Sequence, residues 1–242
     1  IVDEAHGAHF GFFDGFPETS VRQGADLVIH SVHKTLPSFT QTALLHINGD
    51  LVNRERVRRY LSIFQSTSPS YLLMAGIDQC MELLETEGET RFGIFSERLR
   101  EFYKNAEKLK HLELLNERII KTRDIFDFDR GKLIISAKRT DISGKEVYKR
   151  LLEKYHLQPE MAAGSYCLMI MTMMDTNEGF DRLWAALSKL DEECLDRRSE
   201  EEVFLFQRNR SLMKAHEAID QPKKTVALAD SIGKAAAEYI FL

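Results

Sequence analysis

Residues 1–9 read Ile-Val-Asp-Glu-Ala-His-Gly-Ala-His, and residues 25–37 read Ala-Asp-Leu-Val-Ile-His-Ser-Val-His-Lys-Thr-Leu-Pro. Both stretches pass from a short apolar run into small and polar residues, a pattern typical of buried strands that are followed by loops. A third apolar run ends in the turn Asn-Gly-Asp. Together they predict an α/β sheet, with strands at 1–5, 25–30 and 43–47.

Helical patterns follow this sheet. A first helix is predicted over 53–61. The loop Ser66–Ser70 comes next and offers helix caps, because it holds serines and a proline suited to a first turn. From residue 71 to about 110 the pattern predicts a long helix, with or without a break at Gly88.

A second α/β unit is predicted from about residue 112. Strand-like runs occupy 132–138 and 166–173. Between them, Ser143 and Glu146 form a capping box ahead of an apolar helical face.

The final third of the chain is predicted to be mainly helical and connecting. A helical stripe spans 180–190, and the charged segment 193–222 indicates surface helix or connection. A last helix is expected from about residue 225.

Composition excludes several classes of protein. The chain has 242 residues, a hydrophobic fraction of 43% and a net charge of -5, which suffices for one large or two ordinary domains. The basic residues are dispersed and form no stripe for nucleic acid. No apolar run approaches the roughly 20 residues of a membrane span. Three widely spaced cysteines favour a reduced cytoplasmic protein.

The two ends of the chain are unusual. The chain lacks an initiator Met and opens on what resembles the end of a buried strand, while residues 235–242 run apolar to the last position. Domain termini are usually exposed and polar. We therefore expect this chain to be an internal piece of a longer protein.

Five of the eight histidines lie in the first 46 residues, among several charged side chains. One interpretation of this cluster is a helicase, because Asp3-Glu4-Ala5-His6 spells the DEAH box that holds Mg²⁺ for phosphoryl transfer. The Ser-Ala-Thr motif expected after such a box is missing. The dispersed basic residues also argue against a nucleic-acid partner.

A second interpretation is a metal site. Asp3, His6 and His9 are spaced three apart, and carboxylate with imidazole suits Zn²⁺ or Fe²⁺. However, the segment between the histidines is rich in small residues and follows a strand. No helix is therefore expected to present both rings on one face.

A third interpretation is a pyridoxal-phosphate (PLP) site, which needs a lysine for the aldehyde, an acid for the pyridine nitrogen and donors for the phosphate. Asp3, at a strand end, suits the pyridinium by Coulomb attraction and a charge-assisted hydrogen bond. Ala5, two residues on, is predicted to face the same side of the strand with a small methyl. Lys34 follows the second strand, where Ser31 and His33 can donate to a phosphate.

These residues lie in a longer series of blocks that resembles the Orn/Lys/Arg decarboxylases, a PLP-dependent family of fold type I. The order and spacing of the blocks make the resemblance specific. The blocks are Asp3–Phe10, Gly24–Val28, Ser31–Pro37, Thr40–Ala43, Ser66–Tyr71 and Glu160–Asp175.

The resemblance implies a role for each of the site residues. Lys34 would be the Schiff-base lysine, Asp3 the pyridine partner and Ala5 a ring contact. Ser31 and His33 would then be phosphate ligands.

The resemblance also implies a homodimer or higher homo-oligomer with shared active sites, in which Thr67 and Ser68 reach the phosphate of the neighbouring subunit. The reaction would be α-decarboxylation of lysine, arginine or ornithine. Lys34 or His6 would act as the acid that protonates Cα. The implied architecture is a mostly parallel large-domain sheet followed by a smaller α/β domain, divided as 1–72, 73–110 and 111–242.

Other assignments stay open at this level. A fold type I aminotransferase or aldolase shares Asp3 and Lys34, and a non-catalytic homologue is a further alternative.

Glu160 precedes a glycine turn and could meet a basic substrate. The other early histidines and the Met run at 169–174 are interpreted as core packing. The upstream phosphate loop and the ring-stacking residue of the family are not in this chain, so we expect it by itself to bind PLP weakly or not at all and not to turn over substrate.

Overall fold

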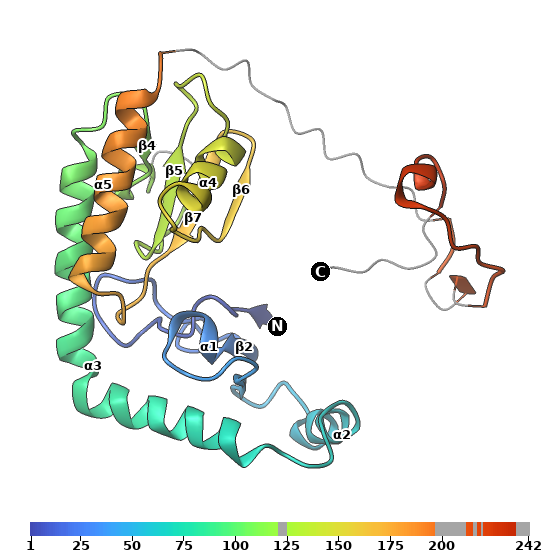
Figure 1. Cartoon of the computed structure of the whole chain (residues 1–242). Coiled ribbons are helices and arrows are strands. Elements are labelled where there is room, and N and C mark those ends of the chain that lie inside the picture. Colours follow the sequence, from blue (N-terminus) through green and yellow to red (C-terminus); the bar gives the residue numbers. More distant parts are fainter. Residues whose placement is uncertain (121–124, 197–211, 215–216, 219, 236–242) are drawn as a thin grey trace. The chain divides into compact units, whose positions relative to one another are not determined.

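The computed structural model describes residues 1–120, 125–196, 212–214, 217–218 and 220–235. The chain divides into two compact units, Ile1–Glu202 and Val203–Leu242. The first contains both sheets and the helices α1 to α5 (Figure 1). The predicted boundaries at residues 72 and 110 stay an interpretation.

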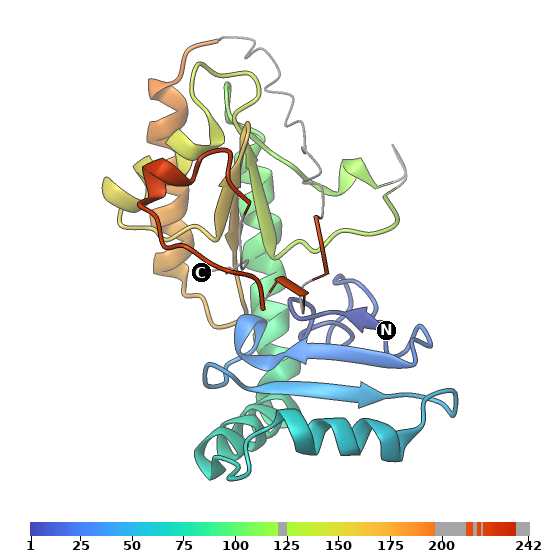
Figure 2. The same cartoon turned by 90° about the vertical axis from the view of Figure 1, so that its right-hand side faces the viewer.

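The first sheet has the order β1-β2-β3, formed by Val2–Asp3, Leu27–Ser31 and Ala43–Ile47. β1 pairs with β2 in parallel, whereas β2 and β3 are antiparallel and lie side by side in Figure 2. The sequence predicts a mostly parallel sheet. Of these two strand pairings, β1 with β2 is parallel as predicted, and β2 with β3 is not. Segment 32–42 contains only the single helical turn α1 (Val32–Thr35). A parallel crossover needs a dozen or more residues, so the chain returns antiparallel.

Two capped helices follow. Asn53 caps α2 (Arg54–Phe64) by accepting the backbone N–H of Arg56 at 2.9 Å. Ser70 caps α3 (Tyr71–Ala106) by accepting the N–H of Leu73 at 3.4 Å. The loop between the helices thus supplies the cap that its sequence predicts.

The long helix α3 is unbroken at Gly88, which is buried. A mid-helix glycine costs about 1 kcal/mol relative to alanine, and the buried apolar face of the helix offsets this cost. The helix ends earlier than predicted because the N–H groups of Lys110, His111 and Leu112 donate to Asp191 instead of continuing it, at 2.7–2.9 Å.

The second sheet has the order β4-β5-β7-β6 and is antiparallel throughout. Two of its strands, β5 and β7, end earlier than predicted, and β6 had no clear signal in the sequence. The strands are β4 (Glu113–Leu114), β5 (Lys132–Ser136), β6 (Met161–Ala163) and β7 (Tyr166–Ile170).

Helices α4 (Gly144–Glu153) and α5 (Asn177–Glu193) belong to the same unit. Ser143 accepts the N–H of Glu146 at 3.2 Å, as the capping box predicts, but the Glu146 carboxylate binds Arg150 at 2.8 Å. One half of the predicted box therefore forms.

The core lies where α3, α5 and the second sheet meet. Figure 1 shows α3 and α5 side by side. Between these helices, Phe102 of α3 packs edge-on against Phe180 and Trp184 of α5. Burial of one such aromatic ring stabilises the fold by about 1.5–3 kcal/mol. Met169, Met171 and Met173 are buried in the same core, which confirms their predicted packing role, whereas Met174 is exposed and the prediction is wrong for it.

The three cysteines are also buried, and none forms a disulfide. Burial raises the pKa of Cys167 to about 12, which keeps this thiol protonated.

In the described residues of the second unit, Glu217 and Ala218 are helical, in line with the surface helix or connection predicted over 193–222, and Leu228–Ser231 forms a 3₁₀ turn. The last helix predicted from about residue 225 is therefore reduced to this turn as far as residue 235. Residues 236–242 and most of the connection predicted at 193–222 lie outside the described residues.

Candidate functional site

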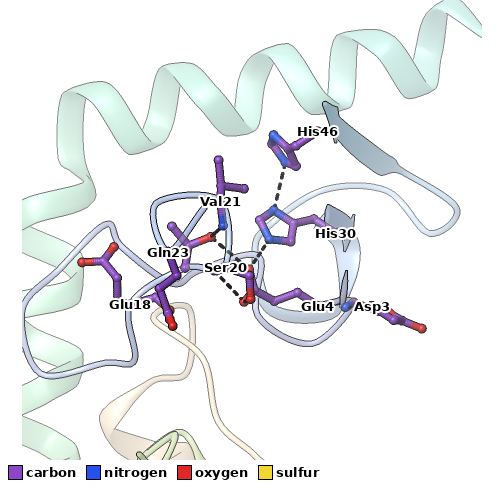
Figure 3. A network of polar contacts seen from close by, with 10 residues as sticks. Asp3, Glu4, Glu18, Ser20, Val21, Gln23, His30 and His46 are labelled. Atoms are coloured by element: carbon purple, nitrogen blue, oxygen red, sulfur yellow. Dashed lines mark hydrogen bonds and ion pairs between the residues drawn. The ribbon is translucent and has the colours of Figure 1, made fainter. Parts of the chain in front are cut away.

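Two neighbouring carboxylates diverge where β1 ends. Asp3 is exposed, and its Oδ1 accepts the backbone N–H of Ala5 at 3.0 Å. Glu4 turns the other way, into a network behind the sheet (Figure 3). The strand ends at Asp3, not at Ala5 as predicted. Ala5 lies in a turn, so strand alternation does not set its direction.

Behind the sheet, the buried Glu4 carboxylate accepts four hydrogen bonds. The donors are the Ser20 N–H at 3.0 Å, the Ser20 hydroxyl at 2.6 Å, the Thr19 hydroxyl at 3.0 Å and His30 Nε2 at 2.6 Å. Burial raises the pKa of Glu4, but these donors outweigh it and lower the pKa below its usual value. His46 Nε2 lies 3.1 Å from His30 Nδ1 and extends the network to β3 (Figure 3).

The protonation pattern of this network is self-consistent. His30 donates through Nε2 to Glu4, so a neutral His30 ring has a bare Nδ1 that accepts the Nε2–H of His46. Burial, followed by the neighbouring His30, lowers the pKa of His46, which favours the neutral ring. Each donor therefore has an acceptor. The network ties the Thr19–Ser20 turn to all three strands, which supports a structural role for His30 and His46.

Two of the predicted phosphate ligands lie where β2 passes into α1. Ser31 is half-buried, and its hydroxyl makes no hydrogen bond to another described residue. His33 lies 3.0 Å from the Thr42 carbonyl through Nδ1, which must therefore donate. Its Nε2 can donate to a phosphate only when the ring carries a second proton.

Lys34 and His6 meet on the other side of this turn. The exposed Lys34 Nζ lies 3.1 Å from His6 Nε2. The opposite ring nitrogen, His6 Nδ1, lies 3.3 Å from Nζ of Lys132, the first residue of β5. The structure thus brings together two residues named from the sequence and adds a third from the second sheet. No spacing or motif marked Lys132, because its contact with His6 exists only in the tertiary structure.

The charges around this cluster oppose protonation of His6. Burial lowers the pKa of His6 most, followed by Lys132 and Lys34, while Glu160 and Asp3 act in the opposite direction. The pKa of Lys132 is lowered in the same way.

For Lys132, burial is the largest cause and the charge of Lys34 adds to it, whereas Asp129 and Glu160 oppose the shift. Asp129 also faces His9, with Oδ1 3.4 Å from the buried ring at Nε2. Asp129 is thus a second site neighbour that the sequence did not indicate.

The remaining predicted ligands, Thr67 and Ser68, are exposed in the connection between α2 and α3. The Ser66 hydroxyl donates to the Ser68 carbonyl at 3.1 Å and accepts its N–H at 3.2 Å, which shapes the loop. Within the described part of one chain, no hydrogen bond joins this loop to Lys34 or Ser31. Their action in a neighbouring subunit stays a prediction.

The donor set fits PLP. A carboxylate at a strand end, a lysine amine past the neighbouring parallel strand and an unpartnered hydroxyl supply the acid, the amine and a phosphate donor. By contrast, the alternative metal site does not form in the described residues. There His6 faces two lysines and His9 faces Asp129, and no group of three ligands converges.

The class defined by this fold and site is the fold type I PLP enzymes. The model for "Orn/Lys/Arg decarboxylase, major domain" matches residues 1–148, and the chain belongs to this family. Membership accounts for the Asp-Glu-Ala-His stretch and overturns the helicase alternative.

Similar proteins carry the same assignment. The arginine decarboxylases of Bacillus subtilis and Halalkalibacterium halodurans are 30% and 31% identical to the chain over 100% of its length. The chain covers 50% of each of these relatives, so it spans about half the length of the curated proteins it matches.

Solved structures share the fold. The Francisella novicida lysine decarboxylase has a TM-score of 0.58 at 21% identity, covering 69% of this chain and 28% of that one. An alanine–glyoxylate aminotransferase from Nostoc reaches 0.55 at 16% identity, covering 78% and 52%. No helix in the described ranges is long and apolar enough to cross a membrane.

Proposed function

We propose that the protein containing this chain catalyses PLP-dependent α-decarboxylation of lysine, arginine or ornithine, releasing CO₂ and the corresponding amine. The observation that carries the proposal is the placement of Asp3 and Lys34. Asp3 ends one parallel strand, and Lys34 lies just past the end of its neighbour, beside His6. Family membership and the named relatives support the same chemistry.

Each side chain has a task that follows from its position. PLP, when bound, supplies an electron sink for the bond that loses CO₂. Lys34 holds the cofactor through its amine, and Asp3 keeps a proton on the pyridine nitrogen by its negative charge. Ser31 donates to the phosphate, and His33 does so when doubly protonated. His6 or Lys34 delivers a proton to the substrate Cα.

Glu160 is suited to recognise the basic end of the substrate. Its side chain is exposed, and its charge acts on both His6 and Lys132. A carboxylate beside the site attracts an ammonium or guanidinium group. Glu160→Gln is expected to raise KM more than it lowers kcat. An unchanged KM would contradict this role.

We further propose a cytoplasmic homodimer with shared sites, whose product supplies polyamine biosynthesis. The dimer is supported by large apolar side chains that are exposed on both sides of the Ser66–Ser70 loop. A surface of this kind is typical of a contact with another protein chain. The exposed side chains are Leu51, Tyr60, Ile63, Phe64, Tyr71, Leu72 and Met74.

A mixing experiment tests the shared site. Lys34→Ala protein and Thr67→Ala/Ser68→Ala protein are each expected to be impaired. Mixed after dissociation and reassociation, they should regain part of the activity, because some dimers then combine one intact half-site from each partner. Proven subunit exchange without recovery would contradict the shared site.

The reaction itself is tested on the full-length protein. Purified enzyme with PLP receives lysine, arginine or ornithine, and the products are identified by mass spectrometry. One diamine or agmatine with an equal amount of CO₂ is expected. An oxo acid would identify an aminotransferase instead, and no turnover with any of the three would contradict the proposal. Lys145→Ala, a change on the exposed face of α4, is the matched control for Lys34→Ala.

A further inference from the structure

One imidazole ring lies between two lysine amines. Lys34 approaches His6 at Nε2 from α1, at 3.1 Å, and Lys132 approaches it at Nδ1 from β5, at 3.3 Å. The bridge therefore connects the two sheets of the first unit. Both ring nitrogens are engaged, and both partners are of the same chemical kind.

The hydrogen-bonding capacity of these groups limits their charge. A lysine ammonium can only donate, and a neutral imidazole has one bare nitrogen and one N–H. Two ammonium groups therefore cannot both donate to His6. The observed bridge is satisfied when one lysine is an ammonium and the other is a neutral amine that accepts the ring N–H.

The surroundings favour this arrangement. Burial and the two lysines lower the pKa of His6 against the opposing charges of Glu160 and Asp3, so the ring is neutral. Burial and Lys34 lower the pKa of Lys132 against Asp129 and Glu160. Both shifts act in the direction that the hydrogen-bonding pattern requires, toward a neutral ring and a neutral Lys132 amine.

We propose that Lys132 is a positioning residue for Lys34, with which it exchanges a proton through His6. In one state, the Lys34 ammonium donates to Nε2, and the Nδ1–H donates to the Lys132 amine. The Lys34 N–H bond then breaks as a bond forms at Nε2, and the Nδ1–H bond breaks as a bond forms at Lys132. No proton enters or leaves, and Lys34 becomes a neutral nucleophile.

This exchange would prepare Lys34 for an aldehyde without releasing a proton to water. The inference rests on Lys34 being the amine that holds the cofactor, as proposed above. It does not depend on which amino acid is decarboxylated. The rival account is a static one, in which the positive charge of Lys132 simply repels the proton from Lys34.

The test measures the protonation of Lys34 in the cofactor-free full-length protein. Trace acetic anhydride is applied between pH 6 and 10, and acetylation of Lys34 is quantified by mass spectrometry relative to the exposed Lys145. In the wild type, Lys34 should be labelled more strongly at pH 7.5 than Lys145. Lys132→Met should move its profile upward and lower its labelling at pH 7.5 at least tenfold.

A second variant separates the two accounts. His6→Leu removes the ring that connects the two amines but keeps the charge of Lys132. Proton exchange through His6 requires that His6→Leu lose Lys34 reactivity as Lys132→Met does, whereas a static field preserves it. Wild-type reactivity in His6→Leu would show a static field, and wild-type reactivity in Lys132→Met would show no coupling. Either result overturns the proposal.

Two controls complete the design. Lys149→Met changes an exposed lysine on α4 and should leave the Lys34 profile unchanged. Thermal unfolding of each variant, followed by circular dichroism, checks that it is folded. Because no cofactor or substrate is present, a failure of the decarboxylation assay is distinguishable from a failure here.

Discussion

Two histidine clusters lie next to β1 and differ in how their protons are shared. In the Glu4–His30–His46 cluster, every donor has an acceptor, and His30 is buried. In the Lys34–His6–Lys132 cluster, two donors compete for a ring that can accept one bond. A satisfied buried network fixes structure, whereas competing groups keep an amine available for chemistry. Glu4 and His6 are two positions apart, yet the first lies in a satisfied network and the second between competing donors.

The largest effect is expected from breaking the reactive cluster at its lysine. Lys34→Ala should abolish the borohydride-reducible link to PLP and nearly all turnover, because no other amine replaces it. The melting temperature should stay near that of the wild type, since Lys34 is exposed. Peptide mapping after borohydride reduction gives the measurement. A reduced pyridoxyl group on another lysine would disprove the assignment.

Asp3→Asn sharpens the comparison on the same strand. The neutral amide no longer favours a protonated pyridine, and we expect kcat to fall about 100-fold or more, or about 2.7 kcal/mol in barrier height. Stability should hardly change, because Asp3 makes one exposed hydrogen bond. Steady-state kinetics measure the loss of kcat, and thermal unfolding measures the stability.

A chelator should have no effect on activity. Loss with EDTA and recovery with Zn²⁺ would favour a metal site instead.

Glu4→Gln should reduce stability much more than activity, the reverse of Asp3→Asn. The amide loses charge-assisted bonds from Ser20 and His30, and we expect the free energy of unfolding to fall by about 2–3 kcal/mol. With cofactor and substrate saturating at low temperature, kcat should stay within a few-fold of the wild type. Urea titration compared with Asp3→Asn measures the contrast. Equal stability of Glu4→Gln and Asp3→Asn would contradict the claim that Glu4 stabilises the fold more than Asp3 does.

Acid should weaken the Glu4 cluster in a defined order. His46 has a folded pKa below its ordinary 6.5, so the unfolded state binds more protons and stability falls as pH drops below about 6.5. Glu4 also has a lowered pKa, so its contribution is lost only below its ordinary 4.5. Urea titrations from pH 7.5 to 4 should show the first loss. In His46→Leu the slope around pH 6 should flatten, with a cost at pH 7.5 of about 1 kcal/mol. An unchanged slope would assign the loss to other groups.

Local signals made much of the fold predictable. Apolar runs located β2 and β3, and caps located α3 and α4, because these features act over a few residues. The antiparallel return of β3 and the early end of α3 depended on segment length and on the distant Asp191, which no local pattern encodes.

The residues of the candidate site could be named from the sequence only where local pattern marks them. Asp3, Ser31, His33 and Lys34 lie at strand ends, where sequence pattern and resemblance could name them. Lys132 could not be named, because its significance depends on a contact between two sheets.

The His6–Lys132 contact joins positions 126 apart in sequence. Lys132 also lies 98 positions after Lys34, so at 5–20 residues per second a ribosome needs roughly 5–20 s to make the chain between them. During that interval Lys34 already exists but lacks its proposed partner. Reactivity toward aldehydes would then appear only after the second sheet has folded. A nascent chain would in this way be protected from premature modification by the metabolites around it.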